Sequence, residues 1–258
     1  MLLHQPFNYS PKNKNRELHI WLPDNYGSTQ ERFPVMYFFD GHNLFSDQEA
    51  TYGKCWGLAG FLPHWNRPMI VVGMECGHEG NERIPEYCPY EAGGRFWGSI
   101  HGMGQETLLW IVREVKPYID ASFRTYSFRE ACGIGGSSMG GLMALCGICR
   151  FNPVFSKAAC LSSTISPFMR QIEQDLTRPH IDADTRVYLS FGTEEARTRR
   201  MPETSPLLTR TAKNHYEIAG IFSQLGCAVD FFLQDGGRHC EADWEKQVPR
   251  FMDFLWNA

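Results

Sequence analysis

Short apolar runs alternate with longer segments of helical periodicity, and this alternation constrains the fold more than any other feature of the sequence. The runs are rich in β-branched and aromatic residues, and they predict strands at residues 18–22, 35–39, 69–74, 131–134, 157–161, 186–191 and 227–233. The periodic segments predict helices at residues 105–120, 139–149, 209–225 and 241–256. Strands that alternate with helices across short connections favour a mostly parallel central sheet with helices on both faces, the α/β class.

The chain reads as one domain with two irregular stretches. No composition break, internal repeat or low-complexity tract divides the 258 residues, so residues 1–258 are predicted to form a single α/β domain. The two stretches, residues 46–65 and 77–104, are rich in Gly, Pro, Trp and Tyr. Long loops in a compact domain are commonly functional, and we expect these two insertions to frame the active site.

Charge and composition narrow the classes of function and location. The chain has 25 Lys and Arg against 29 Asp and Glu, a net charge of −4, which gives no cation surplus for binding nucleic acid. No stretch of 18 apolar residues predicts a membrane-spanning helix, and residues 1–10 lack the pattern of a secretory signal. Nine cysteines, several within apolar runs, are typical of a reduced, cytoplasmic protein. The sequence leaves the oligomeric state open, with a homo-oligomer as one option.

A serine motif provides the candidate nucleophile. Residues 136–140, Gly-Ser-Ser-Met-Gly, fit G-x-S-x-G between a predicted strand and a predicted helix. In that context the turn would expose the Ser138 hydroxyl above the sheet edge, and the helix N-terminus would direct N–H groups at the site. The alternatives are a glycine-rich turn without chemistry, or Ser137 as nucleophile, although Ser137 lacks the flanking glycine spacing.

A histidine and a carboxylate follow in the order that acyl transfer needs. His239 comes after the last predicted strand, where a neutral imidazole could accept the Ser138 proton. Glu194 and Glu195 follow the strand at 186–191, and Glu195 is favoured as the carboxylate that orients His239. The order Ser, Glu, His is typical of α/β hydrolases. A surface histidine and solvated glutamates are the structural alternatives.

Two further features belong to the predicted site. An Asp-Gly-His segment ends the strand at 35–39, and the backbone amides of His42 and Met139 are the candidate oxyanion donors. An ordinary Asp-Gly turn is the alternative. The aromatic residues of the two loops, including Trp56, Tyr87 and Trp97, could bind substrate in the pocket or equally form a satellite core beneath the loops.

These residues resemble the putative-esterase group of α/β hydrolases, which includes esterase D, enterochelin-type siderophore esterases and feruloyl esterases. The resemblance covers roughly residues 17–256, and its most specific segments are 114–119 (EVKPYI), 135–141 (GGSSMGG), 152–155 (NPVF) and 161–163 (LSS). It implies an α/β-hydrolase fold with Ser138 as nucleophile, His239 as base and Glu195 as acid. It also implies the amides of His42 and Met139 as the oxyanion hole. The sequence departs from the common pattern in having Gly-Gly-Arg before His239.

The combined expectation is a serine esterase, that is, a carboxylic ester hydrolase working through an acyl-enzyme. Its substrate would be a small-molecule ester of the simple, feruloyl, acetylated-sugar or siderophore type. This chemistry needs no cofactor and no metal. Cys146 and Cys149 have the spacing of a metal or redox pair, but they fall within a predicted helix and no second pair exists. The alternatives are an acyltransferase using the same acyl-enzyme and a non-catalytic binding protein of the same fold.

Overall fold

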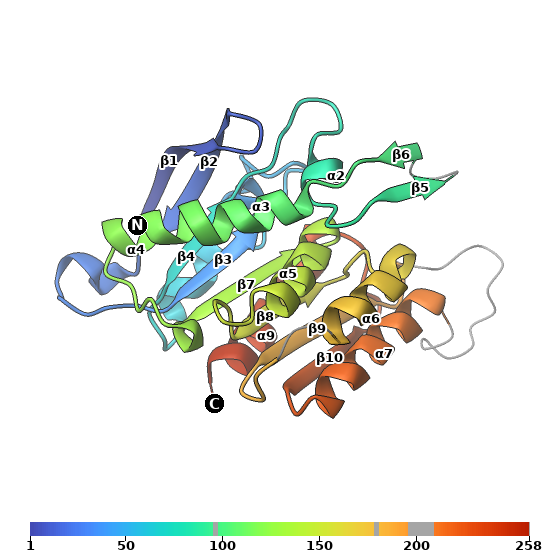
Figure 1. Ribbon diagram of the computed structural model, residues 1–258. Coiled ribbons are helices and arrows are strands. Elements are labelled where there is room, and N and C mark those ends of the chain that lie inside the picture. The colour runs from blue at the N-terminus through green and yellow to red at the C-terminus, as the bar shows by residue number, and fades with distance from the viewer. Residues whose placement is uncertain (95–97, 178–180, 196–208, 258) are drawn as a thin grey trace.

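An eight-stranded sheet forms the centre of the molecule (Figure 1). The computed structural model describes residues 1–94, 98–177, 181–195 and 209–257. The strands of the sheet are β1 (Leu2–Tyr9), β2 (Lys14–Trp21), β3 (Val35–Phe39), β4 (Ile70–Met74), β7 (Cys132–Ser137), β8 (Lys157–Leu161), β9 (Arg186–Gly192) and β10 (Ala228–Gln234). Their spatial order is β1-β2-β4-β3-β7-β8-β9-β10, and only the β1–β2 and β2–β4 pairs are antiparallel. The prediction of a mostly parallel sheet is therefore confirmed.

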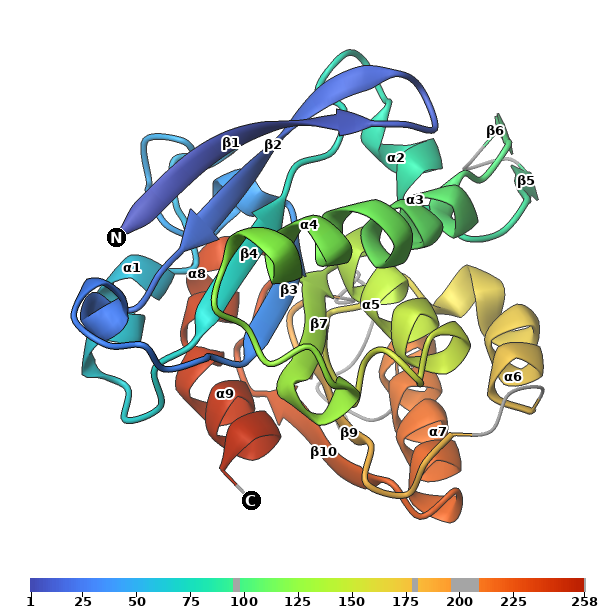
Figure 2. The same ribbon diagram turned by 60° about the vertical axis from the view of Figure 1, so that its left-hand side comes forward.

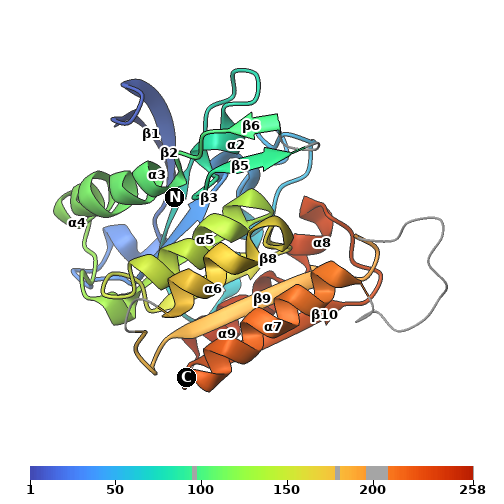
Figure 3. The ribbon, with the colours of Figure 1, turned by 45° about the vertical axis from the view of Figure 1, so that its right-hand side comes forward.

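Helices cover both faces of this sheet, as Figure 2 shows. On one face lie α3 (Gly104–Trp110), α4 (Lys116–Ser122), α5 (Met139–Arg150), α6 (Met169–Thr177) and α7 (Arg210–Gln224). On the other face lie α1 (Leu58–Phe61), α8 (Glu241–Glu245) and α9 (Val248–Trp256). The short helix α2 (Arg83–Glu86) and the small hairpin β5–β6 (Ala92–Gly94, Gly98–Ile100) lie beside the N-terminal end of α3 (Figure 3).

The central strands are apolar throughout because both of their faces are buried. Every residue of β3 and β4 is buried. Successive β3 side chains enter opposite cores: Tyr37 packs with the α3–α7 layer, whereas Met36 and Phe38 pack with α9. Such strands read as continuous hydrophobic runs rather than as alternating patterns.

Two predicted helices are interrupted in the structure. The helix predicted at 105–120 contains a π-helical turn at Ile111–Val115 between α3 and α4. The helix predicted at 241–256 breaks into α8 and α9, and Pro249 lies in the first turn of α9. Proline removes an N–H donor and clashes with the preceding turn, so it fits the start of a helix and not its interior.

Some elements were not predicted at all. Strand β1 is an edge strand whose residues are mostly half-buried or exposed, so it gives a weak hydrophobic signal. Helix α6 is short, but its buried residues Ile172 and Leu176 have helical spacing. That spacing was the available signal for α6.

All nine cysteines are free thiols, and only Cys240 is not buried. Burial raises the pKa of the Cys146 thiol to about 12, which makes it a poor nucleophile and metal ligand.

Within the described residues, no helix combines the length and apolar character needed to cross a membrane.

Candidate active site

Ser138 occupies a sharp turn between β7 and α5. Its backbone angles, φ 58° and ψ −120°, are rarely adopted by residues with a side chain. The turn is held by a hydrogen bond from the Ser138 amide to the Leu161 carbonyl (3.0 Å) and by one from the Leu142 amide to the Ser138 carbonyl (3.1 Å). A Cβ atom on Gly136 would lie 2.7 Å from the carbonyl carbon of Gly140, so the close approach of strand and helix requires glycine. This is the strand–turn–helix geometry of a nucleophile elbow.

His239 and Glu195 are brought together from two neighbouring strands. His239 follows β10, Glu195 follows β9, and the distance from His239 Nδ1 to Glu195 Oε2 is 2.8 Å. The Glu195 side chain is only 4% exposed, whereas that of His239 is 44% exposed. Because a carboxylate can only accept, His239 Nδ1–H donates to Glu195, and the lone pair is on Nε2. That is the tautomer that a general base needs.

The carboxylate is itself fixed by a layer of hydrogen bonds. Glu195 Oε1 accepts from the Gly192 amide (2.8 Å) and from the Ser162 hydroxyl (2.6 Å). Ser162 in turn accepts from the Trp244 indole N–H (2.8 Å), and the Trp244 ring packs edge-on against His239. The roles of Ser162 and Trp244 were missed from the sequence, because neither belongs to a motif that specifies this contact.

Ser138 and His239 line the same cavity, which has a volume of about 540 Å³. The predicted loop at 46–65 contributes Thr51 and Tyr52 to its wall, and the loop at 77–104 contributes His78 and Arg83. Cavities of this size accommodate small organic ligands.

The candidate oxyanion donors lie in the first turns of two helical segments. Met139 begins α5, and His42 lies in a 3-10 turn, Gly41–Asn43, directly after β3. The first N–H groups of a helix have no partner within it. His42 also lines the cavity. The role of both amides stays a prediction.

An ion pair closes one side of the cavity. Both Asp40 carboxylate oxygens accept hydrogen bonds from the Arg83 guanidinium at 2.7 Å. Burial opposes ionisation of Asp40, but the Arg83 charge and hydrogen bonds outweigh it, and the pKa of Asp40 is lowered. Burial also lowers the pKa of His42. Asp40 is therefore ionised and paired, which suits a structural role better than acid–base chemistry.

Two of the three aromatic residues predicted as substrate contacts are buried in the structure. Trp56 is 3% exposed and packs against Phe38 and Phe251 in the core instead of the cavity wall. Tyr87 is 2% exposed, and its hydroxyl accepts a hydrogen bond from the Asp40 amide at 3.2 Å. Large aromatic rings gain most free energy from full burial, and the satellite-core alternative holds for both. Trp97 lies outside the described residues.

The mostly parallel sheet, the serine at the strained β7–α5 turn and the carboxylate-bound histidine after β10 define an α/β hydrolase. The model of the family described as Putative esterase matches residues 10–253, and the chain belongs to this family. It is accordingly a carboxylic ester hydrolase.

Curated proteins of similar sequence include one that is named an esterase. The chain is 26% identical over 255 residues to the uncharacterized protein YbbA of Bacillus subtilis, covering 95% of this chain and 94% of YbbA. It is 28% identical over 152 residues to Esterase Rv1288 of Mycobacterium tuberculosis, covering 59% of this chain and only 30% of that protein.

Solved structures show the same fold at low sequence identity. An IroE-like serine hydrolase from Shewanella oneidensis superposes with a TM-score of 0.76 at 18% identity, over 99% of this chain and 79% of that chain. The enterobactin esterase FES from Shigella flexneri superposes with a TM-score of 0.73 at 14% identity, over 100% of this chain and 59% of that chain.

Proposed function

We propose that this esterase works through an acyl-enzyme on Ser138, with His239 as general base and Glu195 as the carboxylate that orients it. The observation that carries the proposal is the 2.8 Å contact between His239 Nδ1 and Glu195 Oε2, at the rim of the cavity that Ser138 also lines. In the first step Nε2 of His239 takes the Ser138 proton while Oγ attacks the ester carbonyl.

The negative charge that develops on the carbonyl oxygen needs donors. The amides of His42 and Met139 would supply them, and the N-terminal end of α5 would add its positive dipole. Protonated His239 then gives its proton to the leaving alcohol, which leaves an acyl group on Ser138. A water molecule, deprotonated by His239, attacks that acyl group and restores the free enzyme.

The substrate class that we propose is an ester of moderate size with an aromatic or siderophore-like acyl part. The cavity of about 540 Å³ is large enough for such a group, and its wall carries Trp244 and Tyr52 together with polar residues. Similar folds include a ferulic acid esterase and the enterobactin esterase FES, solved in the presence of 2,3-di-hydroxy-N-benzoyl-serine. Simple short-chain and acetylated-sugar esters are the competing substrates.

The test is a pair of matched serine substitutions. Ser138→Ala should abolish hydrolysis of p-nitrophenyl butyrate and labelling by a fluorophosphonate, while circular dichroism shows a native fold. Ser137→Ala, at the neighbouring serine, should retain both. Activity retained in Ser138→Ala, or labelling that is lost only in Ser137→Ala, would contradict the assignment. Comparing kcat/KM for feruloyl, catechol-siderophore and acetyl-sugar esters then tests the substrate class.

A further inference from the structure

Histidines and glutamates from distant parts of the chain gather beside the catalytic cavity. They form two groups, each with ligand atoms within 4.8 Å of one another: His4, Glu17 and His19, and His42, Glu75 and His78. The second group comes from the turn after β3 and the segment after β4, and a pocket of about 460 Å³ contains all three of its members. The same pocket shares His42 and His78 with the catalytic cavity.

We propose that His42, Glu75 and His78 form a binding site for a divalent transition-metal ion, with Zn²⁺ as the best match. Two imidazoles and one carboxylate are a usual protein ligand set for zinc, and a fourth position would be open to water or to a ligand. The ester chemistry described above does not need this ion, although the site shares His42 and His78 with the catalytic cavity.

The spacing of the ligand atoms suits a metal ion. His78 Nε2 and Glu75 Oε2 are 3.5 Å apart, longer than a good hydrogen bond. Metal–ligand bonds of about 2.0–2.2 Å in a tetrahedral site separate the ligand atoms by about 3.3–3.6 Å. The His42 ring packs against the His78 ring with centroids 4.7 Å apart, so the third ligand lies at the same place.

His42 has an unsatisfied buried nitrogen. The residue is 7% exposed, its Nε2 lies 2.9 Å from the Thr51 hydroxyl, and its Nδ1 has no hydrogen-bond partner. Buried polar atoms in folded proteins nearly always have a partner, so an orphan nitrogen requires an explanation. With Nε2–H donating to Thr51, Nδ1 keeps the lone pair that a metal needs.

The Glu75 carboxylate, like the His42 ring, is oriented by a hydrogen bond to a residue outside the ligand set. Glu75 Oε1 lies 2.9 Å from Nε2 of His19, which leaves Oε2 directed toward His78. A hydrogen bond from outside the ligand set commonly positions a metal-binding group. His19 would therefore act as a positioning residue for Glu75.

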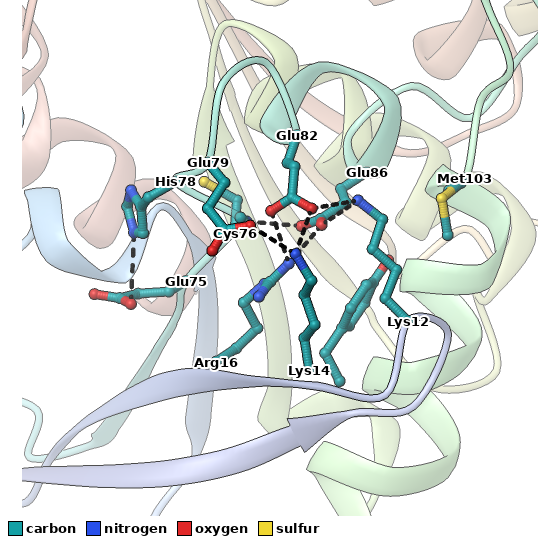
Figure 4. A network of polar contacts seen from close by, with 12 residues as sticks. Lys12, Lys14, Arg16, Glu75, Cys76, His78, Glu79, Glu82, Glu86 and Met103 are labelled. Atoms are coloured by element: carbon teal, nitrogen blue, oxygen red, sulfur yellow. Dashed lines mark hydrogen bonds and ion pairs between the residues drawn. The ribbon is translucent and has the colours of Figure 1, made fainter.

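Three glutamates that follow Glu75 in the sequence are paired with basic side chains, as Figure 4 shows. Lys12, Lys14 and Arg16 form ion pairs with Glu79, Glu82 and Glu86. Among the described residues, Glu75 pairs with no lysine or arginine, and its partners are His19 and His78. A bound cation would supply the positive charge that the adjacent glutamates receive from basic side chains.

Metal binding can be measured without any activity assay. Untagged protein, freed of metal with a chelator, would be titrated with Zn²⁺ against a chromophoric competitor, and Co²⁺ would serve as a spectroscopic probe. We expect a site that binds Zn²⁺ and gives the visible absorption of four-coordinate Co²⁺. His78→Gln should weaken Zn²⁺ binding at least tenfold, remove that absorption and abolish the rise in Tm caused by Zn²⁺.

Two control variants make the result decisive. His101→Gln alters an exposed histidine that pairs with Glu91 and belongs to neither group, and it should leave the affinity unchanged. His4→Gln removes a member of the other group and should likewise leave the affinity unchanged. Absence of Zn²⁺ binding by the wild type, equal weakening in His101→Gln, or a loss in His4→Gln with none in His78→Gln would each overturn the proposal. Circular dichroism of the metal-free variants would verify that they fold.

Discussion

Replacing Glu195 by glutamine tests how the site controls the protonation of His239. Glu195 Oε1 receives two hydrogen bonds, from the Gly192 amide and the Ser162 hydroxyl. The Gly192 amide can only donate, so the glutamine oxygen should take the Oε1 position. The glutamine NH₂ group then faces His239.

The size of the effect follows from the tautomer of the imidazole. An NH₂ group donates to Nδ1, which moves the ring proton to Nε2 and removes the lone pair that accepts the Ser138 proton. Rotating the glutamine side-chain amide by 180° would instead point its NH₂ group at the Gly192 amide, another buried donor. Each buried donor left without an acceptor costs about 1–3 kcal/mol. The equivalent change in Ser–His–Asp enzymes lowers kcat by about 10⁴, so we expect a loss of about 10³–10⁴ with KM little changed. In energy this is about 4–5 kcal/mol of transition-state stabilisation.

The assay is steady-state hydrolysis of p-nitrophenyl acetate at pH 7.5, with active-site titration to count competent enzyme. Glu194→Gln is the matched control, since it makes the same chemical change one residue away and should leave kcat within about twofold. A Glu195→Gln enzyme that keeps kcat within tenfold of the wild type would refute this reasoning. A larger loss in Glu194→Gln than in Glu195→Gln would move the role to Glu194.

Two further predictions concern stability. Burial lowers the pKa of His215 to about 4. Below pH 6.5 the unfolded chain therefore takes up a proton that the folded chain does not. The free energy of unfolding consequently decreases as the pH is lowered. By pH 5 this loss is about 2 kcal/mol, and urea unfolding of His215→Gln at pH 7 and pH 5 should show a pH dependence weaker by that amount; equal pH dependence would contradict it. Gly220 lies within α7, and a Cβ atom added to it would meet no neighbouring segment within 4 Å, so Gly220→Ala should raise the free energy of unfolding by about 0.5–1 kcal/mol. A decrease in urea unfolding would show this second prediction wrong.

Much of the central architecture follows from local sequence pattern. Each predicted strand corresponds to a strand of the sheet, because buried parallel strands produce continuous apolar runs. The glycine spacing around Ser138 predicted the turn, since only glycine permits the approach of β7 and α5. Chain order along a parallel sheet also brought His239 and Glu195 to one edge.

The features that the sequence did not predict depend on tertiary contacts. Trp56 lies in a loop predicted from the sequence, but it is buried against Phe251 of α9, almost two hundred residues away in the chain. Trp244 reaches Ser162 from another distant part of the chain, and no local pattern encodes that bond. The His42 cluster likewise joins segments that only the β3–β4 pairing brings together.

The backbone conformation of Ser138 lowers the stability of the protein, while the side chain of the same residue is the proposed nucleophile. Holding a serine at φ 58° costs about 1–3 kcal/mol, whereas glycine would adopt the same angles with little strain. Selection of variants for heat resistance alone would favour glycine at this position and would discard the hydroxyl. Engineering this enzyme for stability therefore requires an activity screen at every round, because a strained position is also the proposed nucleophile.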